Sequence, residues 1–471
     1  MRNSLFKKCF VILAALLFMS SSLSGRHSTA VYQQKIDFGE LESTILNELE
    51  EKKTPGAALA IVSGDRVLYA EGFGTANVES PSPVTPDMLF RLGSTTKMFT
   101  GAALVTLAED GRIKLDAPIA NYIQGLDPHI ARLTPHNLLS NTAGMRDFAA
   151  PFISHDDSAL SEMVRSWKQE IFFTEPGRIY SYSSAGFWLA GFVIEEIGKK
   201  PYADMMDELL FKPLGMKRTT FRPLVAMTYT LATGHAPGEG GAPSVIRPAF
   251  NNVAMWPAGS IYSSANDLSR FVIAMMNGGR LEGAQALRAS VVSKLPAPHV
   301  TMPGDPDAGY GYGLLTFNHR GVRMNMHGGF SRGYGSMIQM VPEHKVAVIV
   351  VTNKSGETLP KTREKALEML LPLKPATDRA AAAEMPVGEK EMEKYIGLYS
   401  HAPQVWEIFA KQGKLFIKQE GVESPLIKTG NFRFRYGSAG ENEIVLVPGA
   451  DGNAEFLFTG LYSAARVPAP K

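Results

Sequence analysis

Hydrophobic and polar positions alternate in two kinds of pattern along the chain, one typical of strands and one typical of helices. Residues 56–62 and 66–70 are apolar runs separated by a short polar turn, and they predict a strand pair. Residues 334–341 and 345–352, rich in Met, Ile and Val, predict a second pair far downstream. Helical patterns and Pro/Gly-rich loops lie between these pairs, and residues 362–371 predict a closing helix. The pattern therefore predicts an α+β domain, in which helices flank one antiparallel sheet and form a helical subdomain.

The last part of the chain has a different pattern. Residues 373–389 contain prolines and alanines but few large apolar residues, which predicts a linker. Short alternating runs follow the linker at residues 405–410, 414–418, 432–436, 443–447 and 454–458. Their spacing predicts a small all-β domain, a barrel or a sandwich, over residues 390–471. Because 471 residues exceed one ordinary core, we expect a separate first domain over residues 35–372.

The N-terminal residues depart from the average composition. Basic residues precede the apolar run 9–19, and small residues follow at 20–25. This layout is typical of a secretory signal peptide, which we assign to residues 1–24, with cleavage after Ala30 as the alternative to cleavage after Ser24. The run is too short to cross a bilayer, so we expect no stable membrane span, and an uncleaved anchor is the alternative. Cys9 is the only cysteine and lies in this run, so the mature chain has no thiol. A bacterial protein of this kind is periplasmic or secreted.

Composition and charge exclude several classes of function. The chain has 45% hydrophobic and 20% charged residues and a formal net charge of +2, which indicates neither disorder nor a polyanion-binding surface. We therefore expect no nucleic-acid partner. The ten histidines show no close metal-binding spacing, and no Gly-rich phosphate loop precedes a predicted helix. We expect neither a metal nor another cofactor, and the sequence leaves the oligomeric state open.

Ser94 and Lys97 are the first candidates for chemistry. The residues from Met98 to Leu107 predict a mostly buried helix, which Gly111 ends. Ser94 then lies at the helix start with Lys97 one turn later, and side chains at this spacing share a helix face. The partial positive charge of a helix N-terminus favours negative charge near Ser94. A hydroxyl beside an amine predicts a nucleophile with its own base.

Two further segments supply polar groups. Tyr182 and Ser184 lie two residues apart after a Pro-Gly turn, so an extended segment would direct both side chains into one cleft. His327, Gly328, Gly329 and Phe330 lie just before the second predicted strand pair. Glycines there allow a substrate to approach the backbone and to form hydrogen bonds with it.

These three segments, in this order, resemble the serine β-lactamase-related family. The family includes class C β-lactamases, D-alanyl-D-alanine carboxypeptidases, D-aminopeptidases and related esterases. Its signatures are Ser-x-x-Lys, Tyr-x-Asn, and either Lys-Thr-Gly or His-x-Gly. The matching pairs are Ser94 with Lys97, Tyr182 with Ser184, and His327 with Gly329. Residues 134–144 and 256–268 also resemble stretches of the family, so the resemblance extends over about residues 40–370.

The resemblance implies a role for each matched residue. Ser94 is the acylated nucleophile, Lys97 and Tyr182 share the work of the base, and the backbone amides of Ser94 and Phe330 form the oxyanion hole. The implied substrate contacts are Ser184, His327, Gly328, Gly329 and Phe330. Either base needs a lowered pKa, because free Lys and Tyr titrate near 10. The C-terminal domain is similar to the lipocalin-like barrels of some members, which border the cleft.

Two departures from the family pattern bear on the substrate. Ser184 replaces the usual Asn with a smaller group, and His327 replaces the Lys of β-lactamases. A histidine with an ordinary pKa is mostly neutral at pH 7 and holds a substrate carboxylate less strongly. We therefore expect an exported serine hydrolase that acts through an acyl-enzyme on a small molecule or peptide, with a D-amino acid peptide or an ester favoured. Peptidoglycan-derived substrates fit this expectation. The alternatives are a β-lactamase and a non-catalytic sensor of penicillin or peptidoglycan fragments.

Two other motifs are interpreted as coincidental. Ser331 lies in a Gly-x-Ser-x-Gly string typical of α/β-hydrolases, but a strand pattern follows it where that fold needs a helix. Lys428-Thr429-Gly430 lies too far from Ser94 to be the third family signature, and we interpret it as a surface turn.

Overall fold

The computed structural model describes residues 36–147, 154–376, 384–437 and 440–468. The expected signal peptide lies outside the described residues, as does part of the expected linker. Within the described chain, the residues from Glu40 onward form one compact unit. No helix in the described part of the chain is long and apolar enough to span a bilayer.

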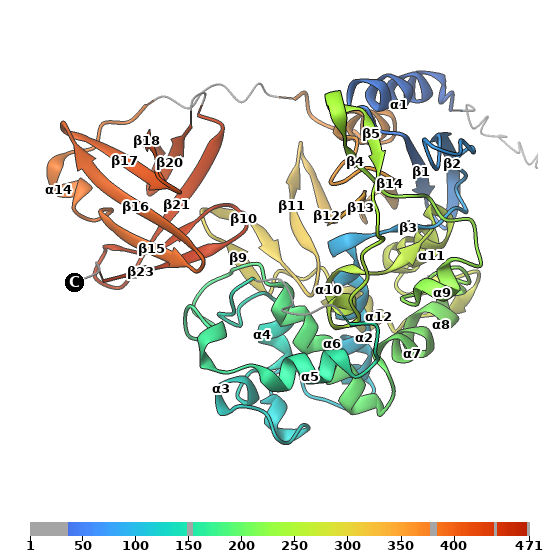
Figure 1. The fold of residues 1–471 in the computed structure, drawn as a ribbon, viewed down its shortest axis with the longest axis horizontal. Helices are drawn as coiled ribbons and strands as arrows, with labels where there is room; N and C mark the ends of the chain where they lie inside the picture. Colours follow the sequence, from blue (N-terminus) through green and yellow to red (C-terminus); the bar gives the residue numbers. More distant parts are fainter. Residues whose placement is uncertain (1–35, 148–153, 377–383, 438–439, 469–471) are drawn as a thin grey trace, which may run out of the picture. The chain divides into compact units, whose positions relative to one another are not determined.

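One large antiparallel sheet organises the first part of this unit (Figure 1). Its strands are β1 (Gly56–Ser63), β2 (Arg66–Gly74), β9 (Val300–Met302), β10 (Asp305–Tyr310), β11 (Leu315–His319), β12 (Val322–Ser331), β13 (Tyr334–Val341) and β14 (Val346–Thr352). Among the described residues their order is β2-β1-β14-β13-β12-β11-β10-β9. Both predicted strand pairs are confirmed, and they meet where β1 pairs with β14.

The sequence of the central strands explains their position. Every residue of β14 is buried, and its alternate residues Ala347, Ile349 and Val351 belong to the main hydrophobic core. The residues between them are also buried, on the opposite face. A strand that is apolar on both faces needs cover on both faces, so a continuous apolar run places β14 inside the sheet.

Helices cover the sheet and build the subdomain below it in Figure 1. They are α1 (Gly39–Glu51), α2 (Thr96–Glu109), α3 (Pro128–Ala131), α4 (Pro135–Leu139), α5 (Ala159–Ser166), α6 (Ser184–Gly198), α7 (Tyr202–Met206), α8 (Lys212–Leu214), α9 (Pro223–Ala226), α10 (Trp256–Gly259), α11 (Ala265–Met276), α12 (Ala289–Lys294) and α13 (Pro360–Leu370). Short strand pairs are β3 (Phe90–Arg91) with β6 (Tyr262–Ser263), β4 (His235–Pro237) with β5 (Pro243–Val245), and β7 (Arg280–Leu281) with β8 (Ala284–Gln285).

Helix α2 is the central helix of this part of the chain. It packs against α6 and α10, and nearly all of its residues are buried. The helix is apolar around its circumference, as expected for a helix enclosed by protein on all sides. The predicted helix after Ser94 and the predicted closing helix, which is α13, are both confirmed.

The C-terminal strands form a second antiparallel sheet that curls into a nearly closed barrel (Figure 1). After α14 (Glu389–Met392) come β15 (Gly397–His401), β16 (Gln404–Lys411), β17 (Lys414–Gln419), β18 (Val422–Pro425), β19 (Ile427–Gly430), β20 (Arg433–Tyr436), β21 (Asn442–Pro448), β22 (Ala454–Phe458) and β23 (Ser463–Val467). In the described residues their order is β18-β17-β16-β15-β23-β22-β21-β20-β19. The predicted barrel-like all-β fold is confirmed.

The interpretation of Lys428-Thr429-Gly430 as a surface turn was wrong. These residues lie in β19, which pairs with β20. The Lys428 side chain is buried, and its ammonium lies 2.5 Å from the Glu391 carboxylate in α14. The pairing of β19 with β20 determines the position of Lys428. The short polar sequence of residues 428–430 does not indicate this pairing.

Candidate active site

Ser94 and Lys97 meet at the start of α2, as their spacing predicts. Ser94 lies in a 3₁₀ turn, Gly93–Thr95, and Lys97 lies in the first turn of the helix that follows. Lys97 Nζ donates a hydrogen bond to Ser94 Oγ at 3.2 Å. It also donates to the Ala258 carbonyl oxygen at 3.0 Å and to Ser184 Oγ at 3.4 Å. Three acceptors therefore match the three N–H donors of a lysine ammonium.

Burial controls the charge of Lys97. Its side chain has no exposed surface, and burial lowers its pKa to about 7, against an opposing effect of the nearby Asp147 carboxylate. Loss of hydration disfavours the charged form of an amine. Near neutral pH, a large fraction of Lys97 is therefore the free amine, whose lone pair can accept the Ser94 hydroxyl proton.

Tyr182 lies on the other side of this pair. The Lys97 ammonium nitrogen lies 4.6 Å from the centre of the Tyr182 ring, and the Ser94 side chain interacts with the Tyr182 hydroxyl. Burial raises the pKa of Tyr182 well above its ordinary value, so the phenol keeps its proton. Of the two bases that the resemblance implies, the environment favours Lys97, and it leaves Tyr182 as a proton donor.

Ser184 reaches the site from a helix and not from the expected extended segment. It is the first residue of α6, and the neighbouring Ser183 caps this helix by accepting a hydrogen bond from the Gly186 amide. Ser184 and Tyr182 nevertheless line the same pocket. A helix start two residues after Tyr182 turns the chain, so the predicted proximity holds although the predicted backbone conformation was wrong.

His327 is an uncharged residue of β12. Its Nδ1 lies 2.7 Å from the Gly328 carbonyl oxygen and its Nε2 lies 3.1 Å from the Tyr310 hydroxyl. A carbonyl can only accept, so Nδ1 carries the proton and Nε2 accepts from Tyr310. Burial, with the nearby Lys97 charge, lowers the pKa of His327 to about 3. His327 is thus neutral across the physiological pH range, in agreement with the expectation from the sequence that a histidine is mostly neutral at pH 7.

Two glycines allow the nucleophile turn to lie against β12. Gly93 adopts a φ of +55°, and a Cβ there would lie 2.3 Å from the Phe330 carbonyl oxygen. A Cβ on Gly329 would lie 1.8 Å from the Leu92 carbonyl oxygen. These approaches bring the backbone of Ser94 next to that of Phe330, the two residues whose amides the resemblance implies as oxyanion donors.

A pocket of about 490 Å³ opens onto Ser94. All eight residues assigned from the sequence lie at this pocket: seven line it, and Lys97 lies beneath it, bonded to Ser94. Pairing between β11 and β12 ends at Met326, so among the described strands residues 327–331 pair with β13 alone. An extended substrate can therefore approach this stretch of backbone.

Asp147 is the functional candidate that sequence reasoning missed. It supplies the one carboxylate among the described residues that line the pocket, and no Lys or Arg is among them. Its Oδ1 accepts from the Ser184 amide at 2.7 Å, and its Oδ2 accepts from the Tyr462 hydroxyl at 2.9 Å. A carboxylate has about four acceptor positions, so Asp147 retains capacity for a ligand donor.

The barrel also contributes to the pocket. Gly460, Leu461 and Tyr462, between β22 and β23, line it. The Leu461 carbonyl accepts from the Tyr182 amide at 3.0 Å, and Ser463 Oγ donates to the Tyr180 carbonyl at 2.7 Å. The backbone around Tyr182 is thus held by a loop of the C-terminal sheet.

Ser331, Arg178 and Arg91 are not among the residues that line this pocket. Ser331 ends β12 and is followed by the antiparallel strand β13, so it is not at a strand-to-helix elbow. Arg178 pairs with Glu455, and the Arg91 guanidinium bonds to the Phe250 carbonyl. Within the described ranges, no group of three or more His, Cys, Asp or Glu residues is arranged to hold a metal ion.

The sheet, its helices and the position of Ser94 define a β-lactamase/DD-peptidase-like fold. The family model described as Beta-lactamase matches residues 41–371, and the chain belongs to this family. Protein flp of Staphylococcus aureus (strain MW2) is 26% identical over 345 residues, which cover 70% of this chain and 65% of that protein. The D-aminopeptidase of Gluconobacter oxydans (strain 621H) is 29% identical over 309 residues, which cover 64% of this chain and 56% of that enzyme. The chain thus spans less than two thirds of the length of either relative.

Solved structures share the fold. An octameric penicillin-binding protein homologue from Pyrococcus abyssi is 25% identical with a TM-score of 0.65, matched over 92% of this chain and 100% of its own. SurE is 22% identical with a TM-score of 0.75, matched over 91% and 98%. The D-amino acid amidase of Ochrobactrum anthropi SV3 is 24% identical with a TM-score of 0.57, matched over 70% and 97%. At these sequence identities, the similarity to SurE and to the D-amino acid amidase shows a shared fold alone.

The close approach at Gly329 gives a first prediction. Gly329→Ala forces a methyl group into the Leu92 carbonyl, so we expect the free energy of unfolding to fall by about 3 kcal/mol. Gly328→Ala is the matched control, because the one close approach of its Cβ would be to the flexible end of Met337, and we expect a change below about 1 kcal/mol. Urea unfolding of both variants measures the difference. Equal losses in the two variants would contradict the assigned contact.

Proposed function

We propose that the protein is a serine hydrolase that forms an acyl-enzyme at Ser94. The observation that carries this proposal is the 3.2 Å contact between Ser94 Oγ and an amine whose pKa burial lowers to about 7. A base that titrates near the working pH combines a large unprotonated fraction with useful basicity. The family membership of the chain supports the same class of reaction.

In the proposed reaction, each proton that leaves one group is taken up by another, and the enzyme regains its starting protonation state. Neutral Lys97 takes the Ser94 hydroxyl proton as Oγ attacks the substrate carbonyl carbon, and the Ser94 and Phe330 amides stabilise the oxyanion. Tyr182 donates its proton to the leaving group as the bond to the carbonyl carbon breaks, and Lys97 returns a proton to Tyr182. Water then attacks the acyl-enzyme, again with neutral Lys97 as the base, and Ser94 is released with its proton restored.

The charges of the pocket favour a substrate with a free amino group near the scissile bond. Asp147 offers a carboxylate to an ammonium, while His327 is neutral and cannot pair with a carboxylate. A β-lactam or a C-terminal dipeptide carries a carboxylate and lacks a cationic partner in this pocket. We propose an N-terminal D-residue, linked through an amide or an ester, because a D-aminopeptidase is among the similar proteins. The proposal includes export, which rests on the leader-like residues 1–24.

Covalent labelling tests the nucleophile. We expect a fluorophosphonate to add one phosphonyl group to the wild type, and Ser94→Ala to abolish this addition and to reduce turnover at least about 10³-fold. Ser331→Ala is the control, because Ser331 lies in the unrelated Gly-x-Ser-x-Gly string, and it should label like the wild type. Intact-protein mass spectrometry provides the measurement. Persistent labelling of Ser94→Ala would exclude Ser94 as the nucleophile.

The pKa of Lys97 predicts the pH dependence. Because the neutral amine is the base, kcat/KM for p-nitrophenyl acetate should rise with pH, reach half of its maximum near pH 7 and level off at higher pH. The Asp147 carboxylate favours the ammonium form of Lys97 and so raises its pKa. Asp147→Asn should therefore shift the rising part of the pH profile, its acidic limb, to lower pH. Asp156→Asn, in an exposed loop, should leave the limb in place. A limb that moves to higher pH in Asp147→Asn would refute the electrostatic link.

Recognition of an amine by Asp147 gives a separate prediction. Asp147→Asn removes the charge but keeps the shape, so kcat/KM for D-alanine p-nitroanilide should fall roughly 10- to 100-fold more than kcat/KM for p-nitrophenyl acetate, which has no amine. The exposed Asp156→Asn serves as the control for both substrates. Equal losses on the two substrates would show that Asp147 acts through the architecture of the site and not through the substrate amine.

A further inference from the structure

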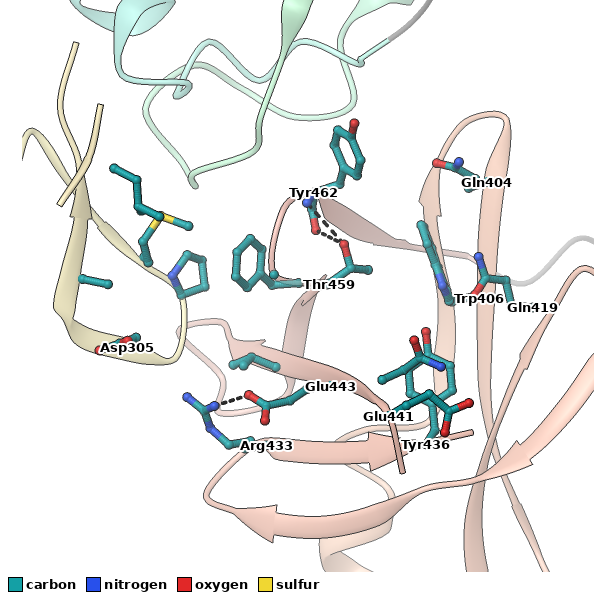
Figure 2. A pocket seen from close by; sticks show the side chains of 18 of the residues that line it. Asp305, Gln404, Trp406, Gln419, Arg433, Tyr436, Glu441, Glu443, Thr459 and Tyr462 are labelled. Atoms are coloured by element: carbon teal, nitrogen blue, oxygen red, sulfur yellow. Dashed lines mark hydrogen bonds and ion pairs between the residues drawn. The ribbon is translucent and has the colours of Figure 1, made fainter. Parts of the chain in front are cut away.

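A second pocket adjoins the catalytic one. Its volume is about 780 Å³, and it lies between the barrel and strands β9–β11 of the large sheet (Figure 2). The two pockets share the lining residues Met302, Leu315, Gly460 and Tyr462. A ligand held at Ser94 can therefore continue into the second pocket without leaving protein contact. We call this space, lined mostly by barrel residues, the barrel pocket.

Both apolar side chains and amide groups line the barrel pocket. The apolar side chains are Met302, Ala308, Leu315, Phe317, Val445 and Phe458. On the barrel side, Gln404, Gln419 and Asn442 line the pocket, and no hydrogen bond engages their side-chain amides within the described chain. Each amide offers both donors and an acceptor, the same groups that a peptide backbone presents in complementary form.

Trp406 supplies an independent sign of a ligand. The ring is buried among barrel residues and lines the pocket, beside Gln419 on the neighbouring strand (Figure 2). Its indole N–H is buried and has no hydrogen-bond partner among the described residues. A buried donor without a partner is costly, and native proteins usually satisfy such groups with protein, water or ligand. The nitrogen has almost no exposed surface, so an acceptor such as a peptide carbonyl reaches it only when the ring turns toward the pocket.

The charges of the barrel pocket disfavour an anionic ligand. Three carboxylates, those of Asp305, Glu441 and Glu443, line it together with one guanidinium, that of Arg433. Arg433 is paired with Glu443, as Figure 2 shows, and it also bonds to the Gly304 carbonyl, which ties the barrel to the β9–β10 turn. The local balance is negative, so an uncharged or cationic ligand is favoured.

We infer that the barrel pocket binds the part of a peptide substrate that extends beyond the residue held at Ser94. The continuity of the two pockets, the free amide groups and the unpaired Trp406 donor favour a peptide chain. The volume lies within the range typical of ligand sites. This inference deepens the proposed function and rests on it, because it assigns the hydrolase an extended peptide substrate and gives the barrel a role in length specificity.

Binding to an inactive protein tests the inference. The full chain carrying Ser94→Ala is titrated by calorimetry with D-alaninamide and with D-alanyl-tetraglycinamide, so that no turnover occurs. We expect the longer probe to bind at least about tenfold more tightly. Trp406→Phe and Gln419→Ala, each added to Ser94→Ala, should bring the ratio of the two affinities close to one. Val405→Ala is the control, because Val405 neighbours Trp406 but its exposed side chain lies outside the pocket lining, and it should keep the ratio.

Each other outcome overturns the inference. Equal affinities for the two probes, or no binding of either, would remove the peptide site. A length preference that survives both Trp406→Phe and Gln419→Ala would place the extra contacts elsewhere. Tighter binding of chitotetraose than of the long peptide would show a saccharide site. These measurements do not involve acylation, so they are distinguishable from a failure of the proposed function, which the labelling of Ser94 decides separately.

Discussion

The burial of the Lys97 amine is the constraint on which the rest of the structure depends. An ammonium without hydration is unfavourable unless acceptors surround it. Here a serine hydroxyl, a second serine hydroxyl and a carbonyl occupy its three donor directions. The apolar surroundings of α2 keep water away, and the glycines at positions 93 and 329 let the nucleophile turn lie directly against β12. Packing that stabilises the fold thus produces a lysine that titrates near neutrality.

The same burial acts in opposite directions on the groups around Lys97. It lowers the pKa values of Lys97 and His327 and raises that of Tyr182, because in every case the neutral form is favoured. The cleft therefore presents neutral side chains and one carboxylate, that of Asp147. Under the proposed function, electrostatic selection comes from this single charge, which attracts amines. His327 removes the positive charge that a lysine would bring, and Asp147 adds a negative charge. Both therefore make the pocket less favourable for a carboxylate and more favourable for an amine.

Local patterns made part of this site predictable. The Ser94–Lys97 contact depends on helix geometry over one turn, and the central strands depend on continuous apolar runs, so both follow from neighbouring residues. The Asp147–Tyr462 bond joins residues 315 positions apart, and no local pattern indicates such a contact. Strands β9–β12 escaped prediction because polar residues and glycines interrupt their apolar pattern. Lys428 was misplaced for a related reason, since only the pairing of β19 with β20 buries it.

The contacts of the barrel loop make the C-terminal sheet part of the architecture of the candidate site. The Leu461 carbonyl fixes the Tyr182 amide, and the Ser463 amide and hydroxyl bond to Ser181 Oγ and the Tyr180 carbonyl. Val445 and Phe458 of the barrel also pack in one apolar cluster with Tyr180, Tyr182 and Tyr310. A displacement of the barrel would therefore hydrate the Tyr182 phenol and loosen its backbone at once. Because low dielectric sets the pKa values of the site, the barrel contributes to these values by excluding water as well as by holding the Tyr182 backbone in place.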